Sequence, residues 1–142
     1  MGLVLDTSVI VAAERGRFDI EKFLLCEAPG IPIYITSITA SELLHGVYRA
    51  SGAIRKKREA FVEDFIEQLS ILPFDLIAAR KHAELRANLD SIGKPIGPHD
   101  LIIAATCVAL NHVIATLNVR EFERVPNLDL SRTQPYEVEE AN

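Results

Sequence analysis

The segment GLVLDTSVIVAAE, residues 2–14, decides the fold class of this chain. Its first part, Gly2–Leu5, is a short apolar run typical of a buried strand, and Val9–Glu14 continues as a helix. Between them, Asp6-Thr7-Ser8 offers the short polar side chains that favour a helix N-terminus. A strand that passes directly into a helix is typical of α/β proteins, so we expect parallel strands joined by helices.

The alternation of strand and helix continues along the chain. The further predicted strands are Ile31–Ile35, Ser70–Leu72, His112–Ala115 and a last short one near Leu128–Leu130. The further predicted helices are Ile20–Glu27, Ile38–Ala50, Ile54–Leu69, Asp75–Leu89 and Leu101–Leu110. In the helix Ile54–Leu69, helical spacing predicts a buried stripe of Ile54, Phe61, Phe65, Ile66 and Leu69. The pattern as a whole predicts an α/β domain with a mostly parallel sheet flanked by helices.

The whole-chain numbers describe an ordinary globular domain. A chain of 142 residues with 49% hydrophobic residues suits one core, which we expect to span residues 1–132. The polar, acidic stretch Thr133–Asn142 is expected to be a loose tail. No apolar run can span a bilayer and no basic region precedes the first one, so we expect a cytoplasmic protein without a signal peptide. Cys107 lies in an apolar helix pattern, and a disulfide with Cys26 is not expected.

The net charge of −5 argues mildly against nucleic acid as a partner. Net charge is a sum, however, and local fields matter more. Arg55, Lys56, Lys57 and Arg58 form one basic run, and a cluster of acids elsewhere would lower the total. The charge therefore leaves nucleic acid open.

Acidic side chains are predicted to meet at one edge of the sheet. In open parallel sheets, binding sites lie beyond the carboxyl ends of the strands. Asp6 directly follows the first strand, and Glu42 is expected in the first turn of the helix after the second strand. Both acids should therefore lie at the same edge.

Asp100 reaches this edge by a different route. Its helix passes through a tight connection at Asn111-His112 into the strand His112–Ala115. If that strand is parallel to the others, the helix begins at their carboxyl edge, with Asp100 in its first turn. Thr116–Asn118 leave the strand at the same edge. Three carboxylates and an amide are thus predicted to converge.

Each acid also has a purely structural explanation. Asp6 suits a helix N-cap. Thr39-Ala40-Ser41-Glu42 matches a capping box, with Ile38 and Leu43 as its hydrophobic staple. Asp100 follows Pro98 and would complement the helix dipole. These explanations do not account for three acids at one edge.

Convergence of carboxylates requires compensation. Two carboxylates about 5 Å apart repel by roughly 3 kcal/mol at an effective dielectric near 20, so three pairs cost on the order of 10 kcal/mol. Such a cost rivals the whole stability of a domain, about 5–15 kcal/mol. A divalent cation supplies the compensation, and oxygen ligands select Mg²⁺ or Mn²⁺. No Cys pair or HExxH spacing indicates zinc. Of the four histidines, only His99, beside Asp100, is a candidate for the site.

Four segments of the chain resemble the motifs of PIN-domain proteins. Leu5-Asp6-Thr7-Ser8-Val9 resembles the opening motif. Residues Ile38–Leu43 with Gly46-Val47 resemble the second, and residues Gly97–Ala105 are similar to the third. Residues Ala115–Phe122 resemble the fourth. The similarity runs in the family's order from about residue 3 to about residue 130, and the small size resembles the VapC toxins of toxin–antitoxin pairs.

The resemblance implies a three-layer, Rossmann-like PIN fold and metal-dependent cleavage of single-stranded RNA. It further implies a homodimer that a VapB-type antitoxin inhibits. Asp6, Glu42 and Asp100 would bind the ion. Asn118 stands at a fourth position that is often Asp, and Glu121 is the alternative carboxylate there. Thr7, Ser8 and Thr116 would orient the ligands.

Two sets of basic residues are candidates for holding RNA. The first is Arg49, Arg55, Lys56 and Lys57 with Arg58, and the second is Arg86 and Lys94. A solvated helix face is the structural alternative for the first set. Apolar side chains could also form a groove for an antitoxin helix, and ordinary core is the alternative for them. The groove residues are Leu44, Val47, Tyr48, Phe61 and Phe65.

Two other functions compete with a nuclease. Haloacid-dehalogenase phosphatases also begin with a strand and an Asp, but they carry a second Asp two residues later, where this chain has Ser8. A PIN-like module that only binds RNA or protein is favoured by Asn118 and disfavoured by Asp6, Glu42 and Asp100. The chain has no G-x-S-x-G elbow, no Ser-His-Asp order and no glycine-rich phosphate loop.

Overall fold

The N-terminal segment folds as a strand that passes directly into a helix. In the computed structural model, which describes residues 1–139, β1 (Leu3–Leu5) leads through Asp6 into α1 (Thr7–Glu14). Asp6 has extended dihedral angles, φ −73° and ψ 154°, and occupies the N-cap position of α1. The amide of Asp6 donates to the carbonyl of Ala115 at 2.9 Å, so the end of β1 is tied to a strand more than a hundred residues away.

The other elements complete a four-stranded sheet. They are α2 (Ile20–Glu27), β2 (Ile33–Thr36), α3 (Ser37–Arg49), α4 (Gly52–Gln68), β3 (Ser70–Leu72), α5 (Leu76–Ser91), α6 (Pro98–Leu110), β4 (Val113–Ala115), α7 (Val119–Phe122) and the 3₁₀ turn η1 (Gln134–Tyr136). The strand order is β3-β2-β1-β4, and every pairing is parallel. The chain moves outward from β1 to β3 on one side and places β4 on the other. The carboxyl ends of β1 and β4 thus form the switch point at which open α/β sheets bind ligands.

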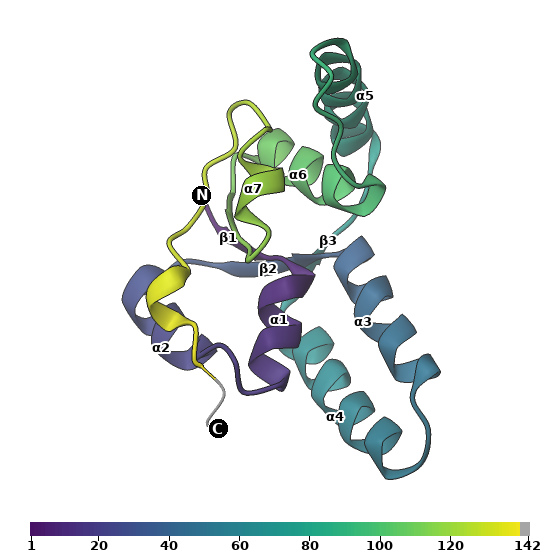
Figure 1. The fold of residues 1–142 in the computed structure, drawn as a ribbon, viewed down its shortest axis with the longest axis vertical. Coiled ribbons are helices and arrows are strands. Elements are labelled where there is room, and N and C mark those ends of the chain that lie inside the picture. The colour runs from purple at the N-terminus through teal and green to yellow at the C-terminus, as the bar shows by residue number, and fades with distance from the viewer. Residues whose placement is uncertain (140–142) are drawn as a thin grey trace.

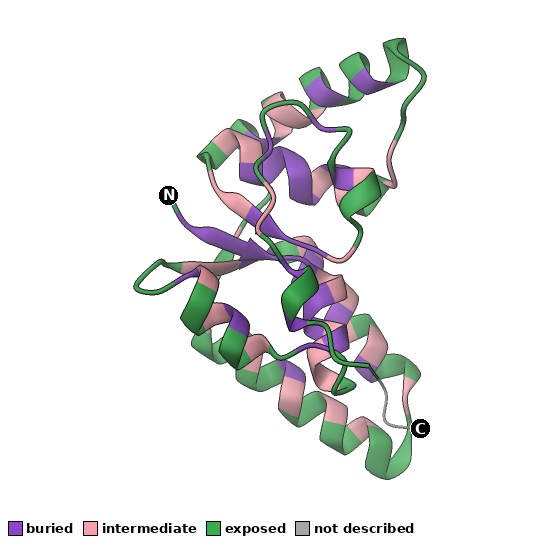
Figure 2. Ribbon diagram, turned by 60° about the vertical axis from the view of Figure 1, so that its left-hand side comes forward, coloured by how far each residue is buried: buried purple, intermediate pink, exposed green. Residues whose placement is uncertain are grey.

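Two hydrophobic cores lie on opposite faces of the sheet (Figure 1). Leu3 and Leu5 of β1 face one core with α1 to α4, whereas Val4 faces the other core with α5 to α7. This alternation follows from the period of two along a strand. Figure 2 shows the buried residues concentrated on β1 and on the helix faces turned toward the sheet. The predicted three-layer α/β fold with a parallel sheet is confirmed.

The last predicted strand is reduced to a single bridge. Leu130 pairs in parallel with Ile114, whose amide donates to the carbonyl of Asp129 at 3.0 Å. Pro126 removes a backbone donor, and Asn127 has a left-handed φ of 63°. These two residues turn the chain immediately before Leu128, so only a short segment can align with β4.

The apolar residues of α4 that were predicted to form a buried stripe are less buried than expected. Val62 is the buried residue of this helix, whereas Ile54 is 66% exposed. Phe61, Phe65, Ile66 and Leu69 are only half-buried at the edge of the core. Helical spacing identifies a shared face, but it does not show how far neighbouring elements cover that face. The outer position of α4 leaves much of this apolar surface at the solvent boundary.

The segment after residue 132 is packed against the domain up to residue 138, so the expected loose tail is wrong there. Tyr136 is 5% exposed, and its ring centroid lies 5.4 Å from that of Phe23 and 6.4 Å from that of Phe18. The amide of Val138 donates to the carbonyl of Arg17 at 2.8 Å. One aromatic anchor holds a segment whose composition is otherwise polar. Residues 140–142 lie outside the described residues.

The remaining whole-chain expectations concern cysteines and membranes. Cys107 is buried and Cys26 is exposed, and both are free thiols. Burial raises the pKa of the Cys107 thiol, which therefore behaves as a small hydrophobic group. Within residues 1–139, no helix has both the length and the apolar composition needed to cross a bilayer.

Tyr136 should be a major contributor to stability. We expect Tyr136→Ala to lower the free energy of unfolding by about 3–5 kcal/mol, because it removes a buried ring and leaves a cavity. Urea denaturation followed by circular dichroism measures the change. Val138→Ala is the control, since Val138 is 48% exposed and should have little effect. If the two variants were equally stable, the segment after residue 132 would behave as a loose tail that does not stabilise the domain.

Candidate active site

Asp6 lies at the centre of the site and is almost completely buried. The residue is 2% exposed, and its Oδ2 accepts hydrogen bonds from Ser8 Oγ and Thr116 Oγ1, each at 2.7 Å. Burial raises the pKa of Asp6, and the two hydroxyls partly oppose this effect. The side chain makes no capping hydrogen bond. Although Asp6 occupies the N-cap position, capping does not explain its carboxylate.

Hydroxyl groups connect the ends of three elements around Asp6. Thr7 Oγ1 donates to Glu42 Oε1 at 2.7 Å, which joins α1 to α3. Ser8 Oγ accepts from the amide of Leu117 at 3.0 Å, which joins α1 to the segment after β4. Each of the three hydroxyl residues, Thr7, Ser8 and Thr116, therefore contacts a predicted site acid directly. Residues in such positions orient the ligands of a metal ion.

Glu42 is not part of a capping box. Helix α3 begins at Ser37, and its N-cap is Thr36, whose Oγ1 accepts from the amide of Thr39 at 3.2 Å. Glu42 consequently lies in the second turn rather than in the predicted first turn. The capping-box alternative is wrong, because the polar residue that caps α3 is the last residue of β2. Glu42 remains at the predicted edge of the sheet, held by Thr7.

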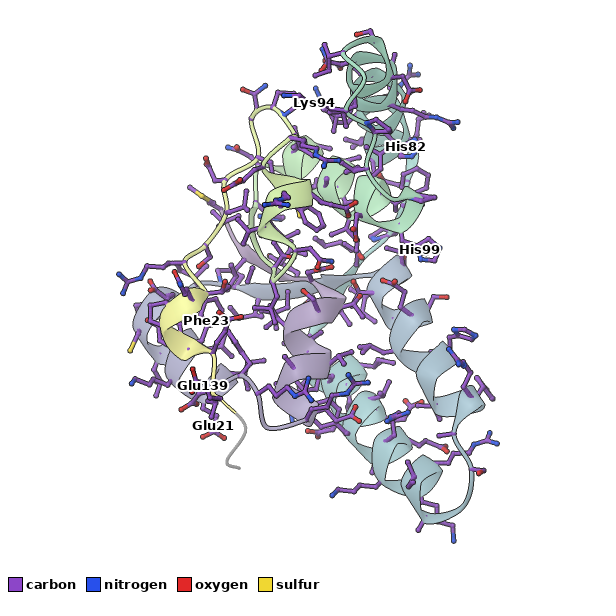
Figure 3. All side chains as sticks on the ribbon, viewed as in Figure 1. Glu21, Phe23, His82, Lys94, His99 and Glu139 are labelled. Atoms are coloured by element: carbon purple, nitrogen blue, oxygen red, sulfur yellow. The ribbon has the colours of Figure 1, made fainter. Side chains whose placement is uncertain are left out.

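His99 is the histidine that approaches the acids. Its Nδ1 lies 3.4 Å from Glu42 Oε2, although its side chain is 55% exposed. Figure 3 shows His99 beside the first turns of α3, whereas Lys94 lies near the top of the view, close to α5. Of these two candidates, His99 is thus at the site and Lys94 is distant from it.

Asp100 lies in the first turn of α6, as predicted, and its charge is strongly disfavoured. Burial raises its pKa to about 8, helped by a hydrogen bond with Glu121 and by repulsion from Asp6, Glu121 and Glu42. A Cβ added at Gly97 would lie 3.8 Å from Asp100 Oδ2 and 4.0 Å from Glu121 Oε2, so both carboxyl groups meet above this glycine. The acids from four elements therefore interact electrically.

Glu121, rather than Asn118, accompanies Asp100. Asn118 is exposed at the N-cap of α7, and its side chain makes no capping hydrogen bond. The backbone amide of Asn118 donates to Thr116 Oγ1 at 3.0 Å, which supports the hydroxyl network instead. Of the two candidates for the fourth position, the structure brings Glu121 into the group of acids.

The donor set fits a hard divalent cation, but the coordination sphere is not formed in advance. Within the part of the chain that the structure describes, no three His, Cys, Asp or Glu side chains are arranged to hold a metal ion in their present positions. The interacting groups are carboxylates supported by hydroxyls, the ligand chemistry of Mg²⁺ or Mn²⁺. Burial raises the pKa of Asp100, helped by repulsion from the neighbouring acids, and a bound cation would oppose this by favouring the charged carboxylate.

The structure separates the basic candidates into several environments. Arg49, Lys56 and Lys57 are exposed, and Arg55 lies 5.3 Å above the ring of Tyr48. Arg58 instead donates from Nε to Glu14 Oε1 at 3.1 Å. On the other side of the site, Arg86 lies 4.0 Å from Asp90 in a cavity that Pro98 also lines.

The five residues of the predicted groove do not form one surface. Val47 is buried core and Tyr48 is 71% exposed. Phe61 and Phe65 of α4 lie 4.9 Å apart, centroid to centroid, and each lines a separate recess. The Phe61 recess includes Ile54 and Lys57, and the Phe65 recess includes Leu24 and Leu69.

Thr39 also belongs to the hydroxyl network, although the sequence indicated only a helix cap for this residue. It is fully buried, and its Oγ1 lies within hydrogen-bond distance of the hydroxyl groups of Thr7, at 3.2 Å, and Thr36, at 3.3 Å. Three threonines thus lead from β2 to Glu42. The close spacing of Thr36 and Thr39 was the available signal, since buried hydroxyls require partners.

Comparison with known proteins defines the class. Residues 3–128 match the model of the PIN domain family. The chain therefore belongs to the PIN-domain family.

Individual relatives narrow this class. Ribonuclease VapC of Rickettsia bellii is 34% identical over 131 residues, covering 92% of this chain and 95% of the relative. The tRNA(fMet)-specific endonuclease VapC of Shigella flexneri is 31% identical over 88% of this chain and 92% of its own length. A chain in the crystal structure of VapBC2 from Rickettsia felis, bound to a promoter DNA fragment, has a TM-score of 0.79 and 30% identity. That match covers 92% of this chain and 97% of the other. Within the PIN family, the chain belongs with the VapC proteins.

The crowding of acids should make the metal-free protein less stable at high pH. Because the pKa of Asp100 is about 8 in the folded state, against 3.8 ordinarily, the folded chain keeps a proton that the unfolded chain loses. Stability should therefore fall as pH rises from about 4 to about 8. With EDTA at pH 8.5, we expect Asp100→Asn to be more stable than wild type by on the order of 2 kcal/mol, reduced from the full shift because the group is half-exposed.

Thermal unfolding between pH 4 and pH 8.5 measures this effect. The difference between wild type and Asp100→Asn should shrink toward pH 4. Asp129→Asn is the control, since Asp129 is exposed and is not among the acids that raise the pKa of Asp100. A wild-type stability that does not decline over this range would contradict the proposed crowding.

Proposed function

We propose that this chain is an endoribonuclease that hydrolyses single-stranded RNA with a bound divalent cation, as the toxin of a toxin–antitoxin pair. The observation that supports the proposal most strongly is the group of acids at the switch point, in which Asp100 has a pKa of about 8. Membership of the PIN family and the ribonuclease names of the relatives add to it. A protein acting on RNA in this way would work in the cytoplasm.

The side chains of the site have separable roles in this proposal. Asp6, Glu42 and Asp100 would hold Mg²⁺ or Mn²⁺. Ser8 and Thr116 fix the buried carboxylate of Asp6, and Thr7 fixes that of Glu42. When bound, the ion lowers the pKa of water and stabilises the charge that develops on the phosphodiester. RNA hydrolysis would then give 5′-phosphate and 3′-hydroxyl ends.

Glu121 would share a proton with Asp100 in the metal-free protein. In the metal-free chain, Asp100 and Glu121 share a hydrogen bond that requires one of the two carboxyl groups to be protonated. For Asp100 to act as an anionic ligand, this proton must leave or move to Glu121. Asn118 is left outside the carboxylate group, where its amide side chain remains free to contact RNA.

Cleavage should depend on both the ion and the acids. We expect Mg²⁺ or Mn²⁺ to raise the melting temperature of wild type and to permit RNA cleavage, and EDTA to abolish cleavage. Asp6→Asn and Asp100→Asn should lower the cleavage rate by about 100-fold or more. Mapping cut ends in total RNA measures activity, and tRNA is the first class to inspect because the Shigella flexneri relative is named for tRNA(fMet).

The alternatives give different results in the same assays. Asp129→Asn, an exposed carboxylate, should cleave like wild type. Cleavage that persists in Asp6→Asn would show that these acids are not the active site. RNA binding without cleavage or a metal response would support a binding-only module, and release of phosphate from p-nitrophenyl phosphate would support a phosphatase.

A VapB-type antitoxin is the partner that we propose. The R. felis structure described above is a VapBC assembly. In this chain, the recess that contains Ile54 and Phe61 offers an apolar floor bordered by Lys57 and by the ion pair of Arg58 with Glu14. Such a surface suits a helix with an apolar face and flanking acids. Glu14 and Arg58 line this recess and also a neighbouring cavity that Glu42 borders, so a bound partner would lie close to Glu42.

A homodimer is supported by an exposed apolar surface at the free edge of the sheet. β3 is the edge strand, and Ile71 on it is 38% exposed. Phe74, Leu76 and Ile77 follow immediately and are 43%, 65% and 58% exposed. Contiguous apolar side chains of this kind are typical of protein interfaces.

Size-exclusion chromatography with light scattering tests both assemblies. The chain alone should have the mass of a dimer, and Ile77→Lys should give a monomer, since a charge would be buried at the interface. Ile92→Lys is the matched control, because Ile92 is 55% exposed at the other end of α5. A co-expressed VapB-type protein should form a larger complex that Phe61→Asp prevents. A monomeric wild type, or complex formation by Phe61→Asp, would contradict the respective interface.

A further inference from the structure

A small cavity extends from Glu42 between α1, α3 and α4, three helices on the same side of the sheet (Figure 1). Its volume is about 100 Å³, whereas one bound water needs only about 10–15 Å³. Glu42 borders the cavity on the side of the acids. Its other charged walls are Glu14, Arg15 and Arg58. The cavity therefore connects the candidate active site to two guanidinium groups.

The two arginines differ in how they are held. Arg58 donates from Nε to Glu14 Oε1 at 3.1 Å and from Nη1 to the carbonyl of Gly46 at 3.4 Å, so its guanidinium is oriented while donors remain available. Arg15 is exposed at the end of α1, and no hydrogen bond or ion pair of its side chain is found among residues 1–139. One guanidinium is thus fixed in place and the other is free to close on a ligand.

Gly46 keeps the cavity open at a position where the fold has room for a side chain. It lies inside α3, where glycine is less favourable than alanine. A Cβ added there would meet its nearest neighbour, Arg58 Cδ, at 3.9 Å, which is ordinary contact. Packing therefore does not require glycine, and alanine would narrow the cavity beside Arg58.

The charges identify the ligand. Glu42 would hold the ion of the proposed function, and the remaining charged walls, Glu14, Arg15 and Arg58, carry one net positive charge. That charge matches a single phosphodiester, and guanidinium groups are the preferred donors to phosphate oxygens. We propose that this cavity, the phosphate seat of Arg15, Gly46 and Arg58, binds an RNA phosphate neighbouring the one that is cut. The inference rests on the proposed function and extends it to substrate positioning.

The phosphate seat predicts a specific loss of salt dependence. The probe is a short, fluorescein-labelled single-stranded RNA, bound in Mg²⁺ by the Asp100→Asn protein to limit cleavage. Adding Arg15→Gln should flatten the slope of log K against log salt by about 0.7, the value for one phosphate contact on a single strand. Arg80→Gln is the matched control, because Arg80 is exposed on α5, across the sheet from the cavity.

Neutral phosphates locate the contact. A set of RNAs carries one methylphosphonate each, at successive positions. At one position, the methylphosphonate should weaken binding to the Asp100→Asn protein that keeps Arg15, but not to the protein that also carries Arg15→Gln. Gly46→Ala should raise the melting temperature yet weaken RNA binding, which a purely structural glycine would not do. Arg58→Gln is avoided as the main test, since it would leave the half-buried Glu14 unpaired.

The outcomes separate this inference from the proposed function. If the unmutated chain cuts RNA but Arg15→Gln has the same salt slope as Arg80→Gln, the phosphate seat is wrong and the nuclease assignment stands. Methylphosphonates that weaken both proteins equally at every position would also overturn the seat. If the unmutated chain neither binds nor cuts RNA, the proposed function itself fails and the seat fails with it.

Discussion

Mutual repulsion among carboxylates at one edge of a parallel sheet is the constraint on which the site depends. Asp6, Glu42, Asp100 and Glu121 come from four separate elements, and burial together with their proximity raises the pKa of Asp100 to about 8. A folded chain without a cation must respond by keeping protons on some of these groups. The repulsion among these acids therefore destabilises the metal-free fold, and a doubly charged ion would relieve it on binding.

The scaffold tolerates this cost because hydroxyl groups and the sheet hold the acids in place. Thr116 and Ser8 share one oxygen of Asp6, and Thr7 reaches Glu42. These donors lie just beyond the carboxyl ends of β1 and β4, the neighbouring strands at the switch point. Hydroxyls stabilise a carboxylate without neutralising it. The arrangement thus keeps the acids oriented while leaving their charge for a cation.

Around the acids, the molecule offers surfaces of different character. The phosphate seat lies on the face of α1, α3 and α4, and the apolar recess of Ile54 and Phe61 is its neighbour on α4 through Arg58 and Glu14. A partner bound in this recess would lie over the seat. Inhibition of a nuclease by a protein partner would then follow from competition for the substrate's position as well as from contact with the acids.

The sequence by itself determined the order of strands and helices, the parallel sheet and the edge that carries Asp6, Glu42 and Asp100, because hydrophobic periodicity and chain direction are local properties. It could not decide between Asn118 and Glu121, since that depends on how α7 turns toward Gly97. It also missed the docking of Tyr136, the partial exposure of α4 and the pairing of Arg58 with Glu14. These features arise from contacts between residues far apart in the chain, and only tertiary packing defines which surfaces are covered and which charges meet.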